Sequence, residues 1–237
     1  MSDPIGPLVV ALDYSSSEKA LELADKLDPS EVRLKVGKQL FTAAGPILVK
    51  NLVDRGFNVF LDLKFHDIPN TVALAIEAAA DLGIWMVNVH ASGGIRMMHA
   101  AREALEKKRD RPLLIGVTVL TSMDARDFAD LNWGEKPIDR VAHLAKLSEI
   151  TGLDGVVCSA LEAPLLKKER RSGFLLVTPG VRLYGESEGD QRRVVTPREA
   201  LANGASHIVM GRSITRADCP QEKVAQIKAE LGVRFRP

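Results

Sequence analysis

Cysteine is scarce in this sequence: its 237 residues include only Cys158 and Cys219. Two cysteines make no disulfide framework, and their separation is not that of metal ligands, which fits a reducing compartment. The N-terminal residues lack a basic stretch followed by an apolar run, so no secretory signal is visible. We therefore expect a cytoplasmic protein.

Net charge and long apolar runs are missing as well. The chain has 32 Lys and Arg against 31 Asp and Glu, which leaves a formal net charge of +1. This balance gives no bulk attraction for nucleic acid or an anionic membrane, so any anion must be held at a local site. No apolar run approaches the roughly 20 residues that span a bilayer. We therefore expect neither nucleic acid nor a membrane as a partner.

Short apolar runs alternate with helical segments along the chain. The runs are rich in β-branched residues and mostly continuous rather than alternating in polarity, which is typical of parallel strands covered by helices. Segments rich in Ala, Leu, Glu and Lys with helical spacing lie between them. The predicted strands are residues 8–13, 33–37, 57–64, 85–91, 113–120, 155–159, 175–181 and 208–211.

A strand and a helix repeated eight times predict a (β/α)8 TIM barrel, and this length fits a single domain spanning residues 1–237. The main alternative is a doubly wound open sheet. Such a sheet usually has a glycine-rich turn after its first strand, whereas Asp13-Tyr-Ser follows here. In a barrel, polar residues at the carboxyl ends of the strands, such as Asn88 and His90 on the fourth, would converge on one mouth.

The third predicted strand ends in charged residues. Asp62 and Lys64 lie two residues apart and so share one face of the strand, and Asp67 follows. Such charges are costly to desolvate unless they offset one another. With Lys35 from the second strand, and Asp67 or Asp13 nearby, each ammonium would lie between carboxylates. This array suits stabilisation of negative charge on a substrate, followed by protonation from a lysine. The alternative is a solvated strand end with a weak surface ion pair.

A second set of polar residues follows the seventh and eighth predicted strands. Loops at this position in barrels often build a phosphate site from backbone N–H groups. Gly211 permits close backbone approach, Arg212 supplies a guanidinium fork, and Gln191 supplies a neutral donor. The polar loop 184–190 is interpreted as a lid over the phosphate, with an ordinary solvated loop as the alternative. This pattern favours a small phosphorylated substrate.

At these positions the sequence resembles the orotidine 5′-phosphate decarboxylase family of bacterial type. The resemblance covers nearly every predicted strand end from residue 9 to about 215, in order. It is carried by Asp62-Leu-Lys-Phe-His-Asp-Ile-Pro-Asn-Thr71, Val-Ala-Leu-Asp13, Arg-Leu-Lys35-Val-Gly-Lys, Val-Asn-Val-His90-Ala-Ser-Gly-Gly, Val-Leu-Thr121-Ser122-Met, Val-Thr-Pro-Gly-Val-Arg182, Gly-Asp-Gln191-Arg-Arg and Gly211-Arg212.

The resemblance implies a carboxy-lyase that works as a homodimer without metal or organic cofactor. The expected reaction converts orotidine 5′-phosphate to uridine 5′-phosphate and carbon dioxide, the last step of de novo pyrimidine synthesis. By resemblance, Lys64 protonates C6 of the pyrimidine and Asp62 lies beside the departing carboxylate. Lys35 and Asp13 are expected to contact the ribose and to complete the charge chain.

The resemblance also implies that subunits share sites. Asp67, with Ile68 and Thr71, is expected to reach into the neighbouring subunit's site, so that the active sites lie at the dimer interface. Thr121 and Ser122 are expected to contact the pyrimidine. The other expected substrate contacts are Pro179 and the phosphate-binding residues Arg182, Gln191, Gly211 and Arg212.

Two other functions remain open at this point. The sugar-phosphate enzymes 3-keto-gulonate 6-phosphate decarboxylase and hexulose-phosphate synthase also have Asp-x-Lys-x-x-Asp on the third strand. They use a magnesium ion held partly by an acidic residue on strand two, where this sequence has Lys35, which is unsuited to ligating magnesium. The other alternative is a catalytically inactive phosphate- or nucleotide-binding barrel. It would keep Gln191 and Arg212 but would not need the charged set Lys35, Asp62, Lys64 and Asp67.

Overall fold

Eight parallel strands form a closed barrel in the computed structural model, which describes residues 5–184 and 195–232. Each strand pairs with its neighbours in sequence, and β1 closes the barrel against β8. The (β/α)8 prediction is confirmed, and the open-sheet alternative is excluded. The strands are β1 (Leu8–Ala11), β2 (Arg33–Gly37), β3 (Val59–Phe65), β4 (Met86–His90), β5 (Leu113–Val117), β6 (Gly155–Val157), β7 (Leu175–Thr178) and β8 (His207–Met210).

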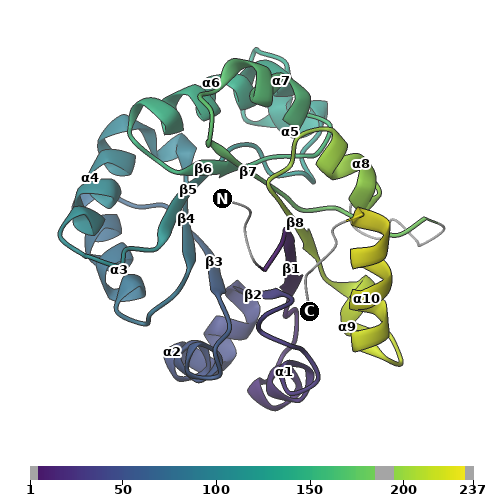
Figure 1. The fold of residues 1–237 in the computed structure, drawn as a ribbon. Helices are drawn as coiled ribbons and strands as arrows, with labels where there is room; N and C mark the ends of the chain where they lie inside the picture. Colours follow the sequence, from purple (N-terminus) through teal and green to yellow (C-terminus); the bar gives the residue numbers. More distant parts are fainter. Residues whose placement is uncertain (1–4, 185–194, 233–237) are drawn as a thin grey trace.

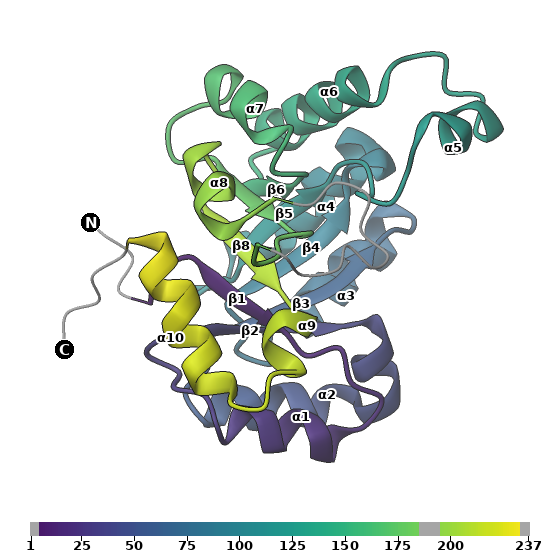
Figure 2. The same ribbon diagram turned by 90° about the vertical axis from the view of Figure 1, so that its right-hand side faces the viewer.

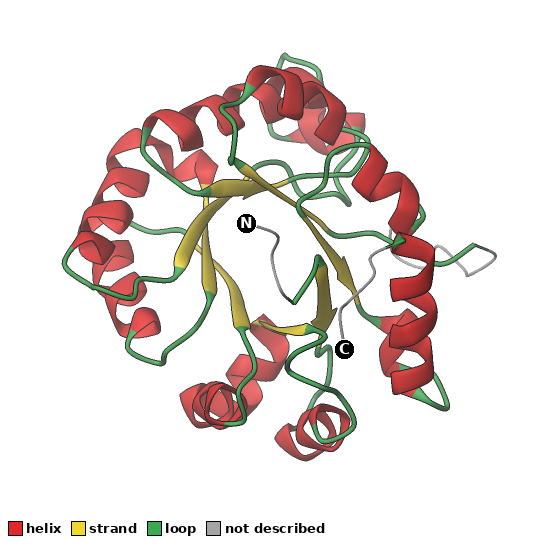
Figure 3. Ribbon diagram, viewed as in Figure 1, coloured by secondary structure: helices red, strands yellow, loops and turns green. Residues whose placement is uncertain are grey.

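Helices surround the strands on the outside (Figures 1 and 3). Figure 2 shows α5 at the outer edge of the molecule, beyond the end of α6. None of the helices in the described ranges is long and apolar enough to cross a membrane. The helices are α1 (Ser17–Ala24), α2 (Lys38–Asp54), α3 (Pro69–Ala80), η1 (Ala91–Gly93), α4 (Gly94–Glu106), α5 (Ala125–Asp130), α6 (Pro137–Ile150), α7 (Ala163–Glu169), α8 (Pro197–Ala202), α9 (Arg212–Thr215) and α10 (Pro220–Leu231).

Local sequence explains where several helices begin. Proline is the first residue of α3, α6, α8 and α10, a position where its missing N–H costs nothing and its fixed φ suits the helix. In front of α8, Thr196 and Glu199 form the reciprocal pair of hydrogen bonds of a capping box. These signals fix the length of the loops that carry site residues.

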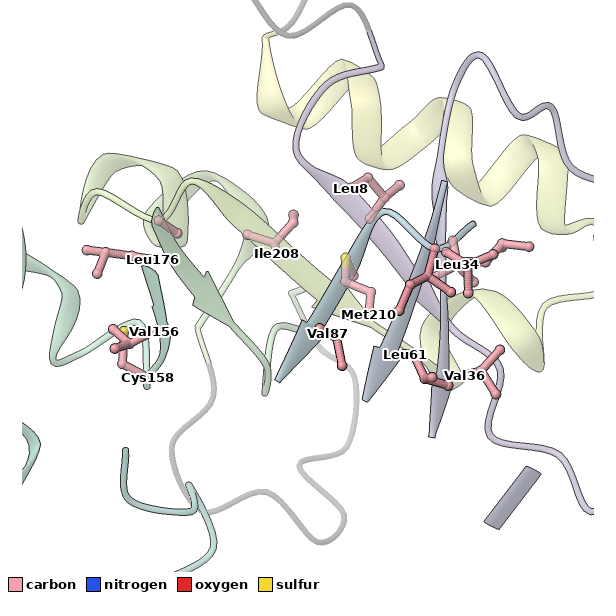
Figure 4. Close-up of a cluster of buried hydrophobic side chains, with 14 of the residues drawn as sticks. Leu8, Leu34, Val36, Leu61, Val87, Val156, Cys158, Leu176, Ile208 and Met210 are labelled. Carbon is pink, nitrogen blue, oxygen red and sulfur yellow. The ribbon is translucent and has the colours of Figure 1, made fainter. Parts of the chain in front are cut away.

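The period-two alternation of the strands creates two separate cores. One lies between the sheet and the helices, and Figure 4 shows part of it, including Leu34, Leu61 and Met210. The other fills the barrel interior with side chains from alternate positions: Val9, Ala11, Phe60, Met86, Ile115, Val177 and Val209. Inward-facing residues nearer the carboxyl ends of the strands, including Lys35 on β2 and Asp62 on β3, therefore lie above this apolar layer.

Candidate active site

A cavity of about 660 Å³ opens at the carboxyl ends of the strands. Its base is apolar and consists of Ala11, Phe60, Val117, Val157, Val177 and Val209. Asp13, Lys35, Asp62 and Lys64 form what we call the charged wall, on the loop after β1 and on β2 and β3. Residues after β7 and β8, which we call the arginine end, line the cavity as well: Pro179, Gly180, Arg182, Gly211, Arg212 and Arg216. The cavity thus offers an ionic wall, an apolar base and a cationic end.

The charged wall is a chain of ion pairs centred on Asp62. Lys64 Nζ lies 2.5 Å from Asp62 Oδ1, and Lys35 Nζ lies 3.2 Å from Asp62 Oδ2. Lys35 Nζ is also 3.7 Å from Asp13 Oδ1. The two lysines therefore share one carboxylate, and Lys35 lies between two carboxylates as the sequence predicted.

Asp62 remains ionised despite its burial. Only 8% of the residue is exposed, and this burial alone would raise its pKa. The charges of Lys35 and Lys64, with hydrogen bonds from Lys64 and Asn88, outweigh the burial and lower the pKa of Asp62 to about 2. Near neutral pH, the carboxylate is therefore a fixed negative charge that holds two ammonium groups at the cavity surface.

The local conformation of β3 differs from a regular strand. Lys64 has a φ of 52°, although it is not a glycine. The register between β3 and β4 shifts between Leu61 and Phe65. Asp62 and Lys64 still reach the same cavity, as the alternation predicted, while Leu63 packs against the outer core.

The arginine end is shaped by backbone as well as side chains. Arg182 is largely buried, and its backbone N–H donates to the carbonyl of Val195 over 3.0 Å. At Gly211, a Cβ atom would lie 3.2 Å from Asp13 Oδ2, so the absence of a side chain keeps β8 close to the charged wall. Arg212 begins α9 directly after this glycine.

Several predicted site residues lie elsewhere in this chain. Asp67, Ile68, Thr71 and Ser122 are exposed and do not line the cavity. The Asp67 carboxylate accepts a hydrogen bond from the backbone N–H of Ile68 over 2.6 Å, beside a separate surface hollow. Thr121 and Pro179 line the cavity as expected. Gln191 and nearly all of the predicted lid lie outside the described residues.

The structure adds Tyr14 to the cavity lining, which sequence reasoning missed. Its hydroxyl donates to the carbonyl of Thr215 over 3.2 Å, which joins the loop after β1 to α9. Burial raises the pKa of this hydroxyl. Its position next to Asp13 at a strand end was the available signal.

His90 and His66 pack together behind the charged wall. Their ring centroids are 5.6 Å apart. Burial first, and then the nearby charges of His66, Lys38 and Lys64, lower the pKa of His90 to about 4, and the opposing effect of Asp62 is smaller. His90 is therefore neutral near pH 7 and lies against His66.

The fold and the cavity define a (β/α)8 barrel with a charged site at the carboxyl ends of its strands. Residues 6–227 match the model of the orotidine 5′-phosphate decarboxylase / HUMPS family. An orotidine 5′-phosphate decarboxylase of Escherichia fergusonii is 57% identical over 226 residues, which cover 95% of this chain and 92% of that protein. One from Vibrio cholerae is 55% identical over 232 residues, covering 98% and 100%.

The chain is also similar to a solved structure of an orotidine 5′-phosphate decarboxylase. The crystal structure of orotidine 5′-phosphate decarboxylase from Lactobacillus acidophilus has a TM-score of 0.86 and 38% identity, and covers 96% of this chain and 100% of its own. The chain therefore belongs to the orotidine 5′-phosphate decarboxylase / HUMPS family.

His90 is expected to contribute to the loss of folding stability at acid pH. Its pKa falls from 6.5 to about 4 on folding, so the unfolded chain binds a proton more readily than the folded chain between these values. Stability is therefore lost as pH falls from about 6.5 to 4. We expect the free energy of unfolding, measured with urea at pH 7 and pH 4.5, to drop less in His90→Asn than in the native protein.

The matched control is His143→Asn, which changes an exposed histidine on α6. This variant should lose as much stability on acidification as the native protein. Equal losses in the native protein and in His90→Asn would contradict the assignment of this acid sensitivity to His90.

Proposed function

We propose that this protein catalyses the decarboxylation of orotidine 5′-phosphate to uridine 5′-phosphate and carbon dioxide, the last step of de novo pyrimidine synthesis. One observation carries the proposal: Lys64 and Lys35 share the buried Asp62 carboxylate at the wall of the cavity. The names of relatives that are 55–57% identical over nearly the whole chain support it.

The chemistry requires a cation fixed in advance at C6. When the bond from C6 to the carboxylate breaks, its electron pair stays on C6 in the plane of the ring, where it is poorly delocalised. A preorganised ammonium stabilises such a charge far better inside a cavity than in water. Lys64 supplies this charge and then donates its proton to C6, and it regains a proton from solvent. In this proposal neither a metal ion nor an organic cofactor takes part.

Asp62 has two tasks in this mechanism. Its carboxylate holds Lys64 and Lys35 by ion pairs of 2.5 and 3.2 Å, so neither ammonium has to be ordered during the reaction. It would also lie beside the substrate carboxylate, where repulsion in the ground state is relieved as carbon dioxide departs. A pKa of about 2 keeps Asp62 charged throughout the physiological pH range.

The cavity suits a nucleotide placed along its length. Its volume lies within the range of small-molecule sites. The pyrimidine would lie over the apolar base near Thr121, with Ser122 approaching on ligand binding, and the ribose would contact Lys35 and Asp13. The phosphate would lie at the arginine end, against Arg182, Gly211 and Arg212, with Gln191 as a further donor. Binding energy gained there, remote from C6, can serve to orient the reacting end.

We further propose that the active form is a homodimer with shared sites. Ile68 is 67% exposed, and Asp67 and Thr71 lie exposed beside it. Within this chain Lys64 contacts only one carboxylate among the described ion pairs, that of Asp62. Asp67 from a second copy would place Lys64 between two carboxylates, as Lys35 already is.

Lys35 argues against the magnesium-dependent chemistry of 3-keto-gulonate 6-phosphate decarboxylase and hexulose-phosphate synthase. Those enzymes hold magnesium partly through an acidic residue on the second strand, and magnesium prefers such oxygen ligands. Here the ammonium of Lys35 occupies that side of the cavity, 3.2 Å from Asp62.

The decisive assay follows the orotate absorbance of orotidine 5′-phosphate with purified protein and chelator present. We expect rapid loss of absorbance. No change with orotidine 5′-phosphate, together with turnover of a hexulose phosphate in the presence of magnesium, would overturn the proposal.

Two variants separate the ends of the cavity. In Lys64→Ala, we expect kcat to fall by about 10³-fold or more, because one group supplies both charge and proton. In Arg212→Ala, we expect KM to rise about 10- to 100-fold through the loss of charge-assisted hydrogen bonds to phosphate. Normal turnover by Lys64→Ala would refute its role, and circular dichroism checks that both variants fold.

Shared sites predict complementation between inactive variants. In a mixture of Lys64→Ala and Asp67→Ala subunits, each mixed dimer regains one site with both native residues. After exchange of subunits, activity should recover to roughly a quarter of the native value, because half the dimers are mixed and each has one complete site. Lack of recovery in proven mixed dimers would contradict shared sites.

A further inference from the structure

Strand β3 separates from the β4 ladder at the site. Leu61 pairs with Val87, and the next paired residues are Phe65 and Val89, so the register advances four residues along β3 but two along β4. The residues between, which include Asp62 and Lys64, bulge out of regular pairing. Lys64 also has the left-handed φ of 52°, a conformation that is strained for a non-glycine residue and persists only where the surroundings enforce it.

Asn88 occupies the gap that this bulge leaves. It lies on β4 between Val87 and Val89 and is 0% exposed. Its Oδ1 accepts a hydrogen bond from the backbone N–H of Lys64 over 2.7 Å. Its Nδ2 donates to Asp62 Oδ1, also over 2.7 Å. The Asn88 side chain thus supplies the backbone N–H of Lys64 with an acceptor in place of a strand-pairing carbonyl, and it also binds the carboxylate that holds both lysines.

The chemistry of these contacts suits an uncharged amide. The N–H of Lys64 needs an acceptor and the Asp62 carboxylate needs a donor, so the orientation of the amide is determined by its partners. An aspartate here would place a second carboxylate against Asp62, although it would keep the acceptor for Lys64. A leucine of similar size would leave both the N–H and the carboxylate without this partner, in a buried place where such losses are costly.

We propose that Asn88 is a positioning residue for the decarboxylation: it fixes the backbone of Lys64 and the carboxylate of Asp62, and so places the Lys64 ammonium for proton transfer. The inference rests on the function proposed above. Asn88 acts from beneath the charged wall and has no contact with substrate in this role. Its effect is therefore expected in kcat rather than in binding at the remote arginine end.

The test compares Asn88→Leu and Asn88→Asp with the native protein. A misplacement of about 1 Å in a reacting group costs about 10²-fold, so we expect both variants to lose about 10²-fold in kcat while KM changes less than about threefold. The control is Asn203→Leu, which removes a partly buried amide that donates to the carbonyl of Ala160 over 3.1 Å, away from the cavity. It should keep kcat within about twofold of native.

A second readout does not depend on activity. Hydrogen exchange of the Lys64 amide, measured by NMR, should be at least about tenfold faster in Asn88→Leu, which lacks the acceptor. It should be nearly native in Asn88→Asp, which keeps the acceptor and remains informative if the leucine variant does not fold.

Native kcat in the folded Asn88 variants, or a loss confined to KM, would overturn the inference. Unchanged exchange of Lys64 in Asn88→Leu would overturn it too. If the native protein fails to decarboxylate orotidine 5′-phosphate, the proposed function falls, whereas the exchange experiment still decides whether Asn88 holds Lys64.

Discussion

The structure of the site depends on one buried carboxylate that two ammonium groups share. Asp62 contacts Lys64 and Lys35 through different oxygens, and Asn88 donates to the first of these oxygens. Removing water from such a group is costly unless every lone pair finds a partner. Here the partners are supplied by β2, β3 and β4, so the closed barrel is what makes this charge arrangement stable.

The barrel also explains how opposite environments lie within one cavity. Alternate residues on each strand point inward, so an apolar layer containing Phe60 and Val177 fills the interior, with the charged wall directly above it. The arginine end follows β7 and β8, and in the eight-strand ring β7 lies opposite β3, which carries Asp62. A nucleotide bound as proposed would therefore meet cations at its phosphate and a preorganised ammonium at its reacting carbon.

Eight alternating strand and helix segments were enough to predict the barrel, and strand order with period-two alternation was enough to bring Lys35, Asp62 and Lys64 together. Those rules could not predict the positive φ of Lys64 or the register shift beside it, because both arise from pairing with a strand 24 residues later, where Asn88 lies. A single chain also leaves Asp67 outside its own cavity, and a partner's contribution leaves no pattern in local spacing. The family resemblance, not periodicity, suggested that contribution.

The central claim is that Lys64 stabilises negative charge at C6, and exchange of the C6 proton of uridine 5′-phosphate tests it most directly. By microscopic reversibility, the site that stabilises the carbanion also promotes its formation from the product. In D2O, NMR should show loss of the C6–H signal with the native protein and none above background with Lys64→Ala. An exchange rate with the native protein equal to that of free nucleotide, in a preparation that turns over orotidine 5′-phosphate, would contradict the account.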